Sequence, residues 1–530
     1  MKGSVLPRAQ SLRGMWLAAR GVLAPGMPAL LVAVAIYVGL FFRLGDFPLF
    51  DVDEGAFGEA TREMLERGDF VTTWLNGAPR FDKPILSYWL QAASVSAFGL
   101  NEFALRLPSA LAGTAWIVAL VAFTRRVSDS ASGWAAGLIA ATSLGVTLIG
   151  RGATADALLN LFLVLAMFDA CRYLQAPRVR YRRRVWLWMA LGVLTKGPVA
   201  LLIPGAVSLI AFALLGQRRS LVAALHDPVC YLILLAVAGP WYWLEYQQQG
   251  QAFIEGFFLH HNVERFAHPL QGHGGSVFYY LPVALALCLP YTGLFLRVLR
   301  GAFVLRPPAL DTFLWCWFLF VLVFFSLAQT KLPHYLIYGM TPLFVLMARQ
   351  RHAIGSRLLA FVPPVLLLGF VVMLPVLAAV IGSAAGNLYL HEMLSRPEVF
   401  GQAWQQAAWA MLGAIVALAL MPRTPAWPRL AASGLICSSA VGGLVLPSLA
   451  ALQQGPVKEA AALVRAAGWP VRTWHFNVPS FSFYRGAVSE RADTLRQGEV
   501  ILTRSDELAG LGQVQMLYRK GGVVLARVGE

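Results

Sequence analysis

Charged residues are scarce in this chain. Of its 530 residues, only 13% are Asp, Glu, Lys or Arg, about half the share that soluble globular proteins carry. Hydrophobic residues make up 58% of the chain, and many of them lie in long runs. This composition excludes an ordinary soluble enzyme of several domains and predicts an all-α polytopic membrane protein.

Cysteine is also rare, so the sequence gives no sign of a protein built around disulfides or structural zinc. The five cysteines lie in or beside apolar runs, and none belongs to a CxxC pair. No disulfide or zinc framework is therefore predicted, and each thiol is expected to be buried as a small apolar group. The 30 prolines and 48 glycines are dispersed among apolar residues, which excludes a disordered or collagenous chain.

What the chain has in place of charge is a series of apolar segments. A membrane-spanning helix needs about 20 mostly apolar residues. We predict about thirteen such helices, at residues 28–43, 107–124, 131–149, 155–173, 184–196, 198–216, 227–245, 278–297, 311–328, 334–348, 357–382, 404–421 and 428–449. Around Gly197-Pro198 the pattern leaves open whether one kinked helix or two helices are present.

The positions of the basic residues provide a check on these predicted helices. The N-terminal segment is basic, and every second loop after it is rich in arginine: residues 125–126, 172–184, 218–219, 297–306, 349–357 and 423–429. Cytoplasmic loops of membrane proteins carry such an excess. We therefore predict a multi-pass protein of the bacterial inner membrane with a cytoplasmic N-terminus and a periplasmic C-terminus. Because topology explains most of the net charge of +16, no nucleic acid is expected as a partner.

The chain divides into three predicted parts. Residues 1–27 form a cytoplasmic segment, residues 28–450 a transmembrane domain, and residues 455–530 a small external α/β domain. The first external loop, residues 44–106, contains two amphipathic stretches at about 56–67 and 84–99, which are expected to be external helices. In the C-terminal part, residues 457–467 are typical of a helix, and strands are predicted at residues 471–476, 499–504, 513–519 and 523–528.

Ionisable residues near membrane depth are costly and usually functional. On the predicted topology the unusual ones share the external side, although they are scattered along the sequence. They are Asp51, Asp53, Glu54, Asp82, Lys83, Arg151, Asp156, Lys196, His260, His261, Glu264, Arg265, His273, Lys331 and His334. Carboxylates and bases gathered at lipid level suit transfer chemistry on a phosphate-bearing amphiphile.

Several of these residues also have a simpler interpretation. The acidic cluster around Asp53 can mark a solvated loop, although clustered carboxylates often have raised pKa values or bind a cation. Asp156 can cap the helix that it begins. Lys196 and Lys331, which lie near prolines at helix ends, can extend their ammonium groups to the interface or bind phosphate as point charges.

Several motifs together resemble one family. They are DEGxxxExxREMLxxGDxV (53–71), LNGAPRFDKPILSYW (75–89), LTKGP (194–198), HNVERF (261–266) followed by GHGGSVFYYLP (272–282), and TKLPHYLIYGMTP (330–342). In this order, over residues 28 to about 345, the chain resembles the lipid A aminoarabinose transferases within the wider protein mannosyltransferase-like group of membrane glycosyltransferases. The resemblance implies a C-type glycosyltransferase fold.

The resemblance also implies an activity. Such enzymes take a sugar from a polyprenyl phosphate carrier, such as undecaprenyl phosphate, outside the cytoplasm, and they invert the anomeric centre. The acceptor would be an envelope molecule: a lipid A-like lipid, a glycan or a protein. Departure of the carrier phosphate needs charge stabilisation by Lys or Arg, and a hydroxyl acceptor needs a base, which a carboxylate can supply. A phosphate acceptor is already ionised, and Asp53 would then position it or bind a cation.

The resemblance assigns roles to individual residues. Asp53 and Asp156 would be the catalytic acidic positions. The donor phosphate would be bound by Lys83, Lys196, Arg265 and Lys331. Supporting residues would be Glu54, Glu59, His334 and Tyr335. In the aminoarabinose transferases a divalent metal ion lies near the acid of the (E/D)KP motif and a later His, which here are Asp82 and His261.

The chain departs from the family pattern in the first loop. Ala56 and Phe57 stand where the family usually carries Arg-Tyr, and the acid of the KP motif is Asp82 in place of the longer Glu. These differences bear on which sugar, acceptor and metal are expected, and they leave the expected class of enzyme unchanged.

A transporter or flippase of lipid-linked sugars is the main alternative. It would place charges near the bilayer midplane, on discontinuous helices in repeated halves. The sequence has neither evident repeats nor mid-helix charges. A non-catalytic binding subunit would not need acids and bases on several loops. The enzyme is therefore the favoured interpretation.

Overall fold

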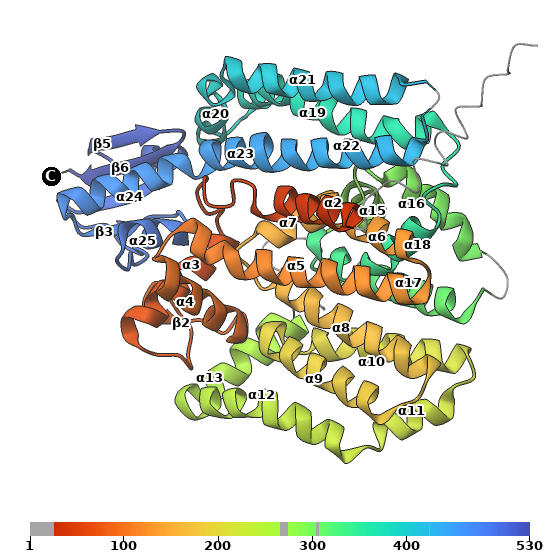
Figure 1. The fold of residues 1–530 in the computed structure, drawn as a ribbon. Coiled ribbons are helices and arrows are strands. Elements are labelled where there is room, and N and C mark those ends of the chain that lie inside the picture. Colours follow the sequence, from red (N-terminus) through yellow and green to blue (C-terminus); the bar gives the residue numbers. More distant parts are fainter. Residues whose placement is uncertain (1–25, 265–273, 304–306, 423, 530) are drawn as a thin grey trace, which may run out of the picture.

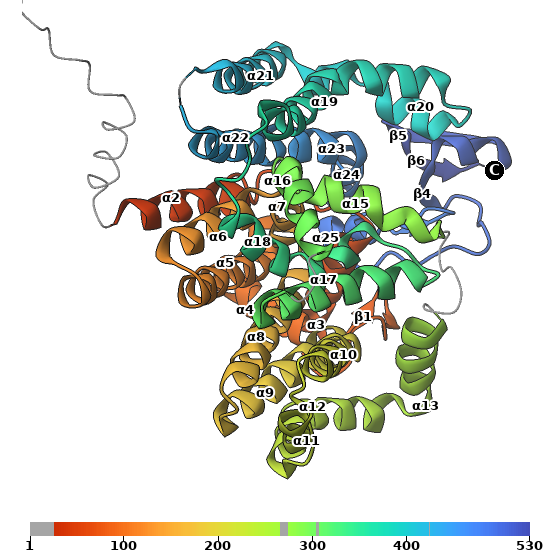
Figure 2. The ribbon, with the colours of Figure 1, turned by 90° about the vertical axis from the view of Figure 1, so that its right-hand side faces the viewer.

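The computed structural model describes residues 26–264, 274–303, 307–422 and 424–529. Most of these residues form long helices, and a small sheet lies at one end of them (Figure 1). Figure 1 and the turned view in Figure 2 both place α19–α23 on one side of the bundle and α8–α12 on the opposite side. The predicted class, an all-α membrane region with a small C-terminal α/β unit, is confirmed.

Helices occupy all thirteen predicted positions. They are α2–η1 (Met27–Phe41), α5 (Glu102–Val127), α6 and α7 (Ser130–Thr142 and Leu144–Arg151), α8 (Asp156–Gln175), α9 (Val179–Lys196), α10 (Val199–Leu214), α12 (Pro228–Gln249), α15 and α16 (Tyr280–Leu287 and Thr292–Leu299), α17 (Ala309–Leu327), η5 and α18 (Pro333–Gly339 and Thr341–Arg349), α19 (Arg357–Ala384), α21 (Gln402–Leu420) and α22–α23 (Ala426–Gln453). Among the described residues, seven helices are long and apolar enough to cross a membrane, or eight if the bent pair α6–α7 is one span. Thirteen crossings therefore stay a prediction.

Two breaks in these helices have local causes. At Gly197, which follows the last residue of α9, φ is +78°, a conformation that only glycine adopts without strain. A β-carbon there would also lie 2.7 Å from Cζ of Phe257. The open question at Gly197-Pro198 is thus settled in favour of two helices, α9 and α10. The predicted single helix 131–149 is instead bent by 63° at Ser143, whose backbone is extended.

The first loop, residues 44–106, contains the two predicted helices. They are α3 (Asp53–Arg67) and α4 (Leu86–Phe98), and the short strands β1 (Trp74–Leu75) and β2 (Ala78–Pro79) form a hairpin between them. Helix α3 begins three residues before the predicted stretch, so that Asp53 and Glu54 lie in its first turn. Consecutive residues point about 100° apart around a helix, and these two carboxylates consequently face different surroundings.

The C-terminal part folds as predicted from its alternating pattern. Helix α24 (Gly455–Ala467) precedes a four-stranded sheet of β3 (Val471–Thr473), β4 (Val500–Arg504), β5 (Val514–Lys520) and β6 (Val523–Val528), in the order β3-β4-β6-β5. Strands β3 and β4 are parallel, and the other pairs are antiparallel. The sequence did not predict α25 (Pro479–Arg485), a short helix between β3 and β4 that packs against α3.

Shorter elements complete the described chain. They are α11 (Arg218–Leu225), α13 (Gln251–Phe253), η2 (Ile254–Glu264), η3 (Val277–Tyr279), η4 (Arg300–Phe303), α20 (Leu388–Leu394), η6 (Pro397–Phe400) and η8 (Ser505–Gly510). The largest buried cluster joins helices from α2 to α22. Within it, Phe123 of α5 stacks on Phe168 of α8 with ring centroids 3.9 Å apart. This contact lies in the C-terminal halves of α5 and α8 and packs the two helices against each other.

Candidate active site

One cavity of about 710 Å³ brings together residues from distant parts of the chain. We name it the central cavity. It is lined by Val52, Asp53, Ala56, Phe57, Leu75, Arg80, Asp82, Lys83, Thr154, Ala155, Asp156, Lys196, His260, Leu332, His334, Tyr335 and Asn477. The first loop, the start of α8, the end of α9, η2, η5 and the C-terminal unit all contribute to its wall.

Asp156 is a carboxylate of this cavity with several bonding partners. Its Oδ1 accepts hydrogen bonds from Nζ of Lys196 at 2.6 Å and from the hydroxyl of Tyr338 at 2.5 Å, and Nε2 of His334 lies 3.7 Å away. Its Oδ2 accepts from the Thr154 hydroxyl at 3.2 Å. Asp156 is the first residue of α8 and does not cap it, because Ala155 occupies the N-cap position. The capping interpretation is therefore wrong.

Asp53 differs from Asp156 in both exposure and bonding. Its side chain is exposed, and within the described residues its carboxylate takes part in no hydrogen bond or ion pair. Asp53, Thr154, Asp156 and His334 also line a smaller cavity of about 230 Å³, so these residues separate the two spaces. An unengaged carboxylate between two cavities is well placed to accept a proton from a bound molecule.

Glu54, the neighbour of Asp53, is buried and fully bonded. Its Oε1 accepts from Nε of Arg106 at 2.9 Å and from the backbone N–H of Ala153 at 2.7 Å. Its Oε2 accepts from Nη2 of Arg106 at 2.7 Å and from the backbone N–H of Phe50 at 2.9 Å. Burial alone would raise the pKa of Glu54, but Arg106 and these backbone donors lower it below its usual value. Glu54 thus links the first loop to the segment that leads into α8.

Basic side chains line the central cavity opposite these acids. Nζ of Lys83 lies 2.6 Å from Oδ1 of Asp82, and Nη2 of Arg80 lies 3.0 Å from Oδ2 of the same carboxylate. Arg80 also lies over the ring of Phe57, 5.3 Å from its centroid. Together with Lys196, which pairs with Asp156 at 2.6 Å, these side chains provide N–H donors that can bind a phosphate group.

Other predicted residues take different places. His334 and Tyr335 line the cavity. Lys331 does not line it, because its ammonium group donates to the carbonyl groups of Ser326 and Ala328 near the end of α17. Glu59 is buried in α3 and pairs with Arg62 at 2.7 Å, and its burial raises the pKa of Glu59 to about 7.

Four of the residues singled out in the sequence cannot be placed in the site. Arg265 and His273 lie outside the described residues, and so do the side chains of His261 and Glu264, whose backbones belong to η2. The roles predicted for Arg265 and His261, phosphate binding and metal binding, stay predictions.

The predicted metal site has little support from the side chains that are described. Both carboxylate oxygens of Asp82 already contact cations, one from Lys83 and one from Arg80, and these compete with a metal ion for the same lone pairs. Among the described residues, no group of three or more His, Cys, Asp or Glu side chains could bind a metal ion.

Sequence reasoning missed three residues of the site. Arg80 was part of a recognised motif, but only its neighbours Asp82 and Lys83 were assigned roles. Tyr338 belongs to the TKLPHYLIYGMTP motif, and its spacing of three residues from Tyr335 along the 3₁₀ helix η5 could have indicated a shared face. Asn477 carries no signal in the sequence, because only the folding of the C-terminal unit brings it to the cavity.

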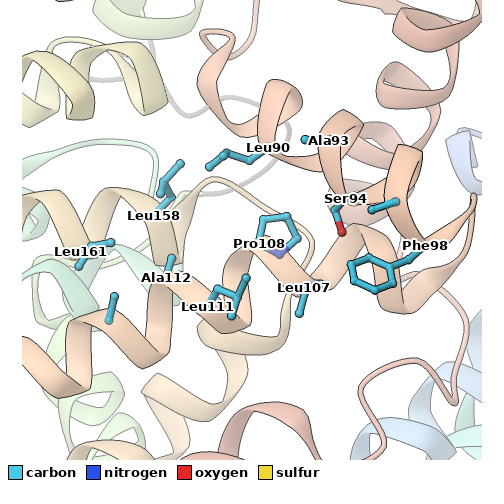
Figure 3. Close-up of a pocket in the computed structure, with 12 residues that line it drawn as sticks. Leu90, Ala93, Ser94, Phe98, Leu107, Pro108, Leu111, Ala112, Leu158 and Leu161 are labelled. Atoms are coloured by element: carbon cyan, nitrogen blue, oxygen red, sulfur yellow. The ribbon is translucent and has the colours of Figure 1, made fainter.

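An apolar groove lies next to the site. It has a volume of about 430 Å³ and is lined from α4, α5 and α8, and Ser94 is its one polar residue among those described (Figure 3). Leu158 and Leu161, which form its wall on α8, lie within two turns of Asp156. A groove of this kind suits a hydrocarbon chain whose polar head reaches the acidic and basic residues.

A helical membrane protein with this connectivity, amphipathic helices in its first loop and charged residues gathered at one end of the bundle has the C-type glycosyltransferase fold. Comparisons with known proteins support this class. A family model described as dolichyl-phosphate-mannose-protein mannosyltransferase matches residues 82–243.

Curated relatives are similar over a larger part of the chain. An undecaprenyl phosphate-alpha-4-amino-4-deoxy-L-arabinose arabinosyl transferase of Pectobacterium carotovorum is 30% identical over 311 residues, which are 57% of this chain and 54% of the relative. A protein of the same name, numbered 2, from Sodalis glossinidius is 33% identical over 64% of this chain and 61% of its own length. The chain thus matches little more than half the length of these relatives.

Solved structures extend the likeness to nearly the whole chain. The crystal structure of ArnT from Cupriavidus metallidurans bound to undecaprenyl phosphate has a TM-score of 0.78 at 21% sequence identity, over 95% of this chain and 98% of that one. Its apo state has a TM-score of 0.75 at 22% identity. The fold is therefore shared, and the resemblance to aminoarabinose transferases and to the wider mannosyltransferase group is confirmed.

Proposed function

We propose that this chain is an inverting glycosyltransferase. It moves a sugar from a polyprenyl phosphate carrier to an envelope acceptor, which is a lipid A-like lipid, a glycan or a protein. The names of its relatives favour undecaprenyl phosphate as the carrier and a 4-amino-4-deoxy-arabinose as the sugar. One observation carries the proposal: a single cavity joins the unengaged carboxylate of Asp53 to the cations of Lys83, Arg80 and Lys196.

The proposed reaction is a displacement at the anomeric carbon. An acceptor oxygen attacks this carbon, the bond to the carrier phosphate breaks, and its electron pair leaves with the phosphate, so the configuration inverts. Lys83, Lys196 and Arg80 stabilise the negative charge that develops on the departing phosphate. The carrier then needs no proton from an acid.

Asp53 acts on the other side of the reacting centre. If the acceptor is a hydroxyl group, its proton moves to the Asp53 carboxylate as the new bond forms. If the acceptor is a phosphate, it is already ionised, and Asp53 positions it. Asp156 does not serve as this base, because Lys196 and Tyr338 already occupy its Oδ1. Its proposed role is to orient Lys196 toward the donor phosphate.

The orientation of the protein follows from this chemistry and from the arginine-rich loops. We place the central cavity at the periplasmic face of the bacterial inner membrane, with the N-terminus in the cytoplasm and the C-terminal unit in the periplasm. The apolar groove beside α4 would then face the outer leaflet, where a lipid-linked sugar presents its head group. No described residue and no comparison favours the flippase alternative.

Reconstitution tests the proposal directly. The purified chain is placed in liposomes with undecaprenyl phosphate-4-amino-4-deoxy-L-arabinose and a lipid A acceptor, and the products are analysed by mass spectrometry. We expect an acceptor that has gained one sugar and a carrier released as undecaprenyl phosphate. Mass spectrometry of envelope lipids and glycans, from cells with and without the gene, identifies the natural acceptor. Movement of intact donor across the bilayer without transfer would instead support a flippase.

A further inference from the structure

The C-terminal unit reaches into the central cavity. Asn477, in the turn between β3 and α25, belongs to the cavity wall together with Val52 and Asp53 of the first loop. The Asn477 side chain is exposed, and within the described part of the chain its amide makes no hydrogen bond. An exposed amide can both donate to and accept from sugar hydroxyl groups or a phosphate.

Three residues beyond Asn477, the same unit bonds to the loop that carries Asp53. The backbone N–H of Ser480 donates to Oδ1 of Asp51 at 3.0 Å, and the Ser480 hydroxyl donates to Oδ2 of the same carboxylate. Gln454, at the start of α24, completes this group. With its amide oriented to satisfy both neighbours, it donates to Oδ2 of Asp51 at 2.9 Å and accepts from the Asp51 backbone at 3.2 Å.

The surroundings of Gly55 show how closely the C-terminal unit approaches the first loop. A β-carbon at this position would lie 1.9 Å from Oδ1 of Asp51 and 2.7 Å from the backbone nitrogen of Ser480. No side chain can therefore be accommodated unless both the Asp51 carboxylate and the C-terminal unit shift. Gly55 lies inside α3, where glycine is otherwise unfavourable by roughly 1 kcal/mol relative to alanine. The glycine of the DEG motif is thus explained by the docking of α25.

A second contact fixes the other side of the loop. The Tyr484 hydroxyl of α25 accepts from the backbone N–H of Leu49 at 2.7 Å and donates to Oε1 of Glu102 at 3.0 Å. Lys458 of α24 pairs with the same glutamate. Phe483 is buried against Leu49 and against Ala153, which precedes the turn into α8. The unit therefore contacts the segments that carry both acidic positions of the site.

We infer that the C-terminal unit contributes residues to the catalytic site. Ser480 positions Asp53 through its bonds to Asp51, and Asn477 contacts the acceptor. This inference rests on the proposed function for the identity of the reaction. The acceptor is assigned to Asn477 because this residue borders the cavity beside Asp53, to which the acceptor presents its reacting group, whereas the donor phosphate is expected at the lysines.

Variants of Ser480 and of a matched serine test the positioning role in the full-length protein. Ser480→Ala removes the hydroxyl that bonds to Asp51. Ser482→Ala, in the same short helix, removes a buried hydroxyl whose bond, from the backbone of Ser489, stays within the C-terminal unit. We expect Ser480→Ala to lower kcat about 10-fold, as the loss of one bond to a carboxylate allows, with the donor KM unchanged. Ser482→Ala should leave kcat within about twofold of wild type.

A double-mutant cycle separates positioning from general destabilisation. If Ser480 acts through Asp51, Ser480→Ala should have little further effect on kcat in an Asp51→Asn background, since residues that share one interaction are not additive. Fully additive effects would overturn the inference. Gly55→Ala adds a steric test: we expect it to lower kcat even though alanine favours the helix, and a more active or equally active variant would contradict the close docking.

Asn477→Ala tests the contact with the acceptor. We expect the acceptor KM to rise about fivefold, as for the loss of one hydrogen bond, with the donor KM and the melting temperature unchanged. Gln497→Ala is the control, because Gln497 is an exposed amide of the same unit that does not line the central cavity. A rise in the donor KM alone, or no change in any constant, would refute the assignment.

Hydrogen–deuterium exchange tests the positioning role of Ser480 without requiring that the proposed function is correct. If the wild-type protein transfers no sugar from the undecaprenyl phosphate donor, the proposed function fails, but exchange can still be measured. Residues 44–57 should exchange faster in Ser480→Ala than in wild type or Ser482→Ala, because their connection to the C-terminal unit is weakened. Equal exchange in all three proteins would show that Ser480 does not position the loop.

Discussion

Asp53 and Glu54 are adjacent carboxylates for which the structure predicts opposite mutational effects. Asp53 is exposed to the central cavity and unbonded within the described residues. Asp53→Asn therefore keeps the shape of the side chain and should cost no more than about 0.5 kcal/mol of stability, as typical exposed substitutions do. If Asp53 is the base for a hydroxyl acceptor, turnover should fall roughly 10²–10⁴-fold, while donor binding persists.

Glu54→Gln should do the reverse. The substitution removes the charge that compensates Arg106, whose side chain is completely buried. It also turns one of the two acceptor oxygens into a donor, although both oxygens now accept from Arg106 and from a backbone N–H. Breaking a buried ion pair by removing one partner costs about 3–5 kcal/mol. We expect a marked fall in melting temperature, and any loss of turnover should follow the loss of folded protein.

For each variant, stability and turnover are measured on the same purified sample. Thermal unfolding in detergent gives the stability, and sugar transfer in liposomes, normalised to folded protein, gives the turnover. Arg106→Lys is a useful companion to Glu54→Gln, because it keeps the charge but cannot reproduce the bidentate contact, and it should destabilise as well. Wild-type turnover in a folded Asp53→Asn protein would refute the assignment of Asp53 as the base. A Glu54→Gln protein as stable as wild type would show that the buried pair is misassigned.

Four further predictions concern charge, pH, metal and topology. Lys83→Ala should raise the donor KM, whereas Lys331→Ala should change stability more than donor KM because its ammonium group bonds carbonyl groups outside the cavity; equal donor effects would contradict this division. Burial raises the pKa of Asp51 to about 7 despite its bonds to Ser480, so the stability that it contributes is complete below about pH 4 and is lost as the pH rises through 7. The decline in melting temperature from pH 5 to pH 8 should therefore shrink in Asp51→Asn, and an unchanged decline would assign it to other groups. Elemental analysis of wild type and His261→Ala tests the metal, and near-zero content in both would end that hypothesis. Reporter fusions after Arg184 and after the C-terminus should report cytoplasm and periplasm respectively; a periplasmic signal at Arg184 would overturn the thirteen-helix map.

Local sequence determined the elements of this protein. Runs of about 20 apolar residues located helices at all thirteen positions, because a helix in lipid must be apolar over that length. Alternating residues located the four C-terminal strands, since successive side chains of a strand face opposite sides. Both patterns are contained in short stretches of sequence, so they can be recognised without knowledge of the fold. They failed where the backbone breaks within a single apolar run, as at Ser143 between α6 and α7.

Only the tertiary structure decided what the charged residues do. Asp53 and Glu54 are neighbours in one motif, yet one is open to the cavity and the other is buried against Arg106. Lys196 and Lys331 have similar sequence surroundings, yet only Lys196 lines the cavity. Asp51 and Ser480 are 429 residues apart. A residue's environment depends on which distant surfaces pack against it, and no local window contains that information.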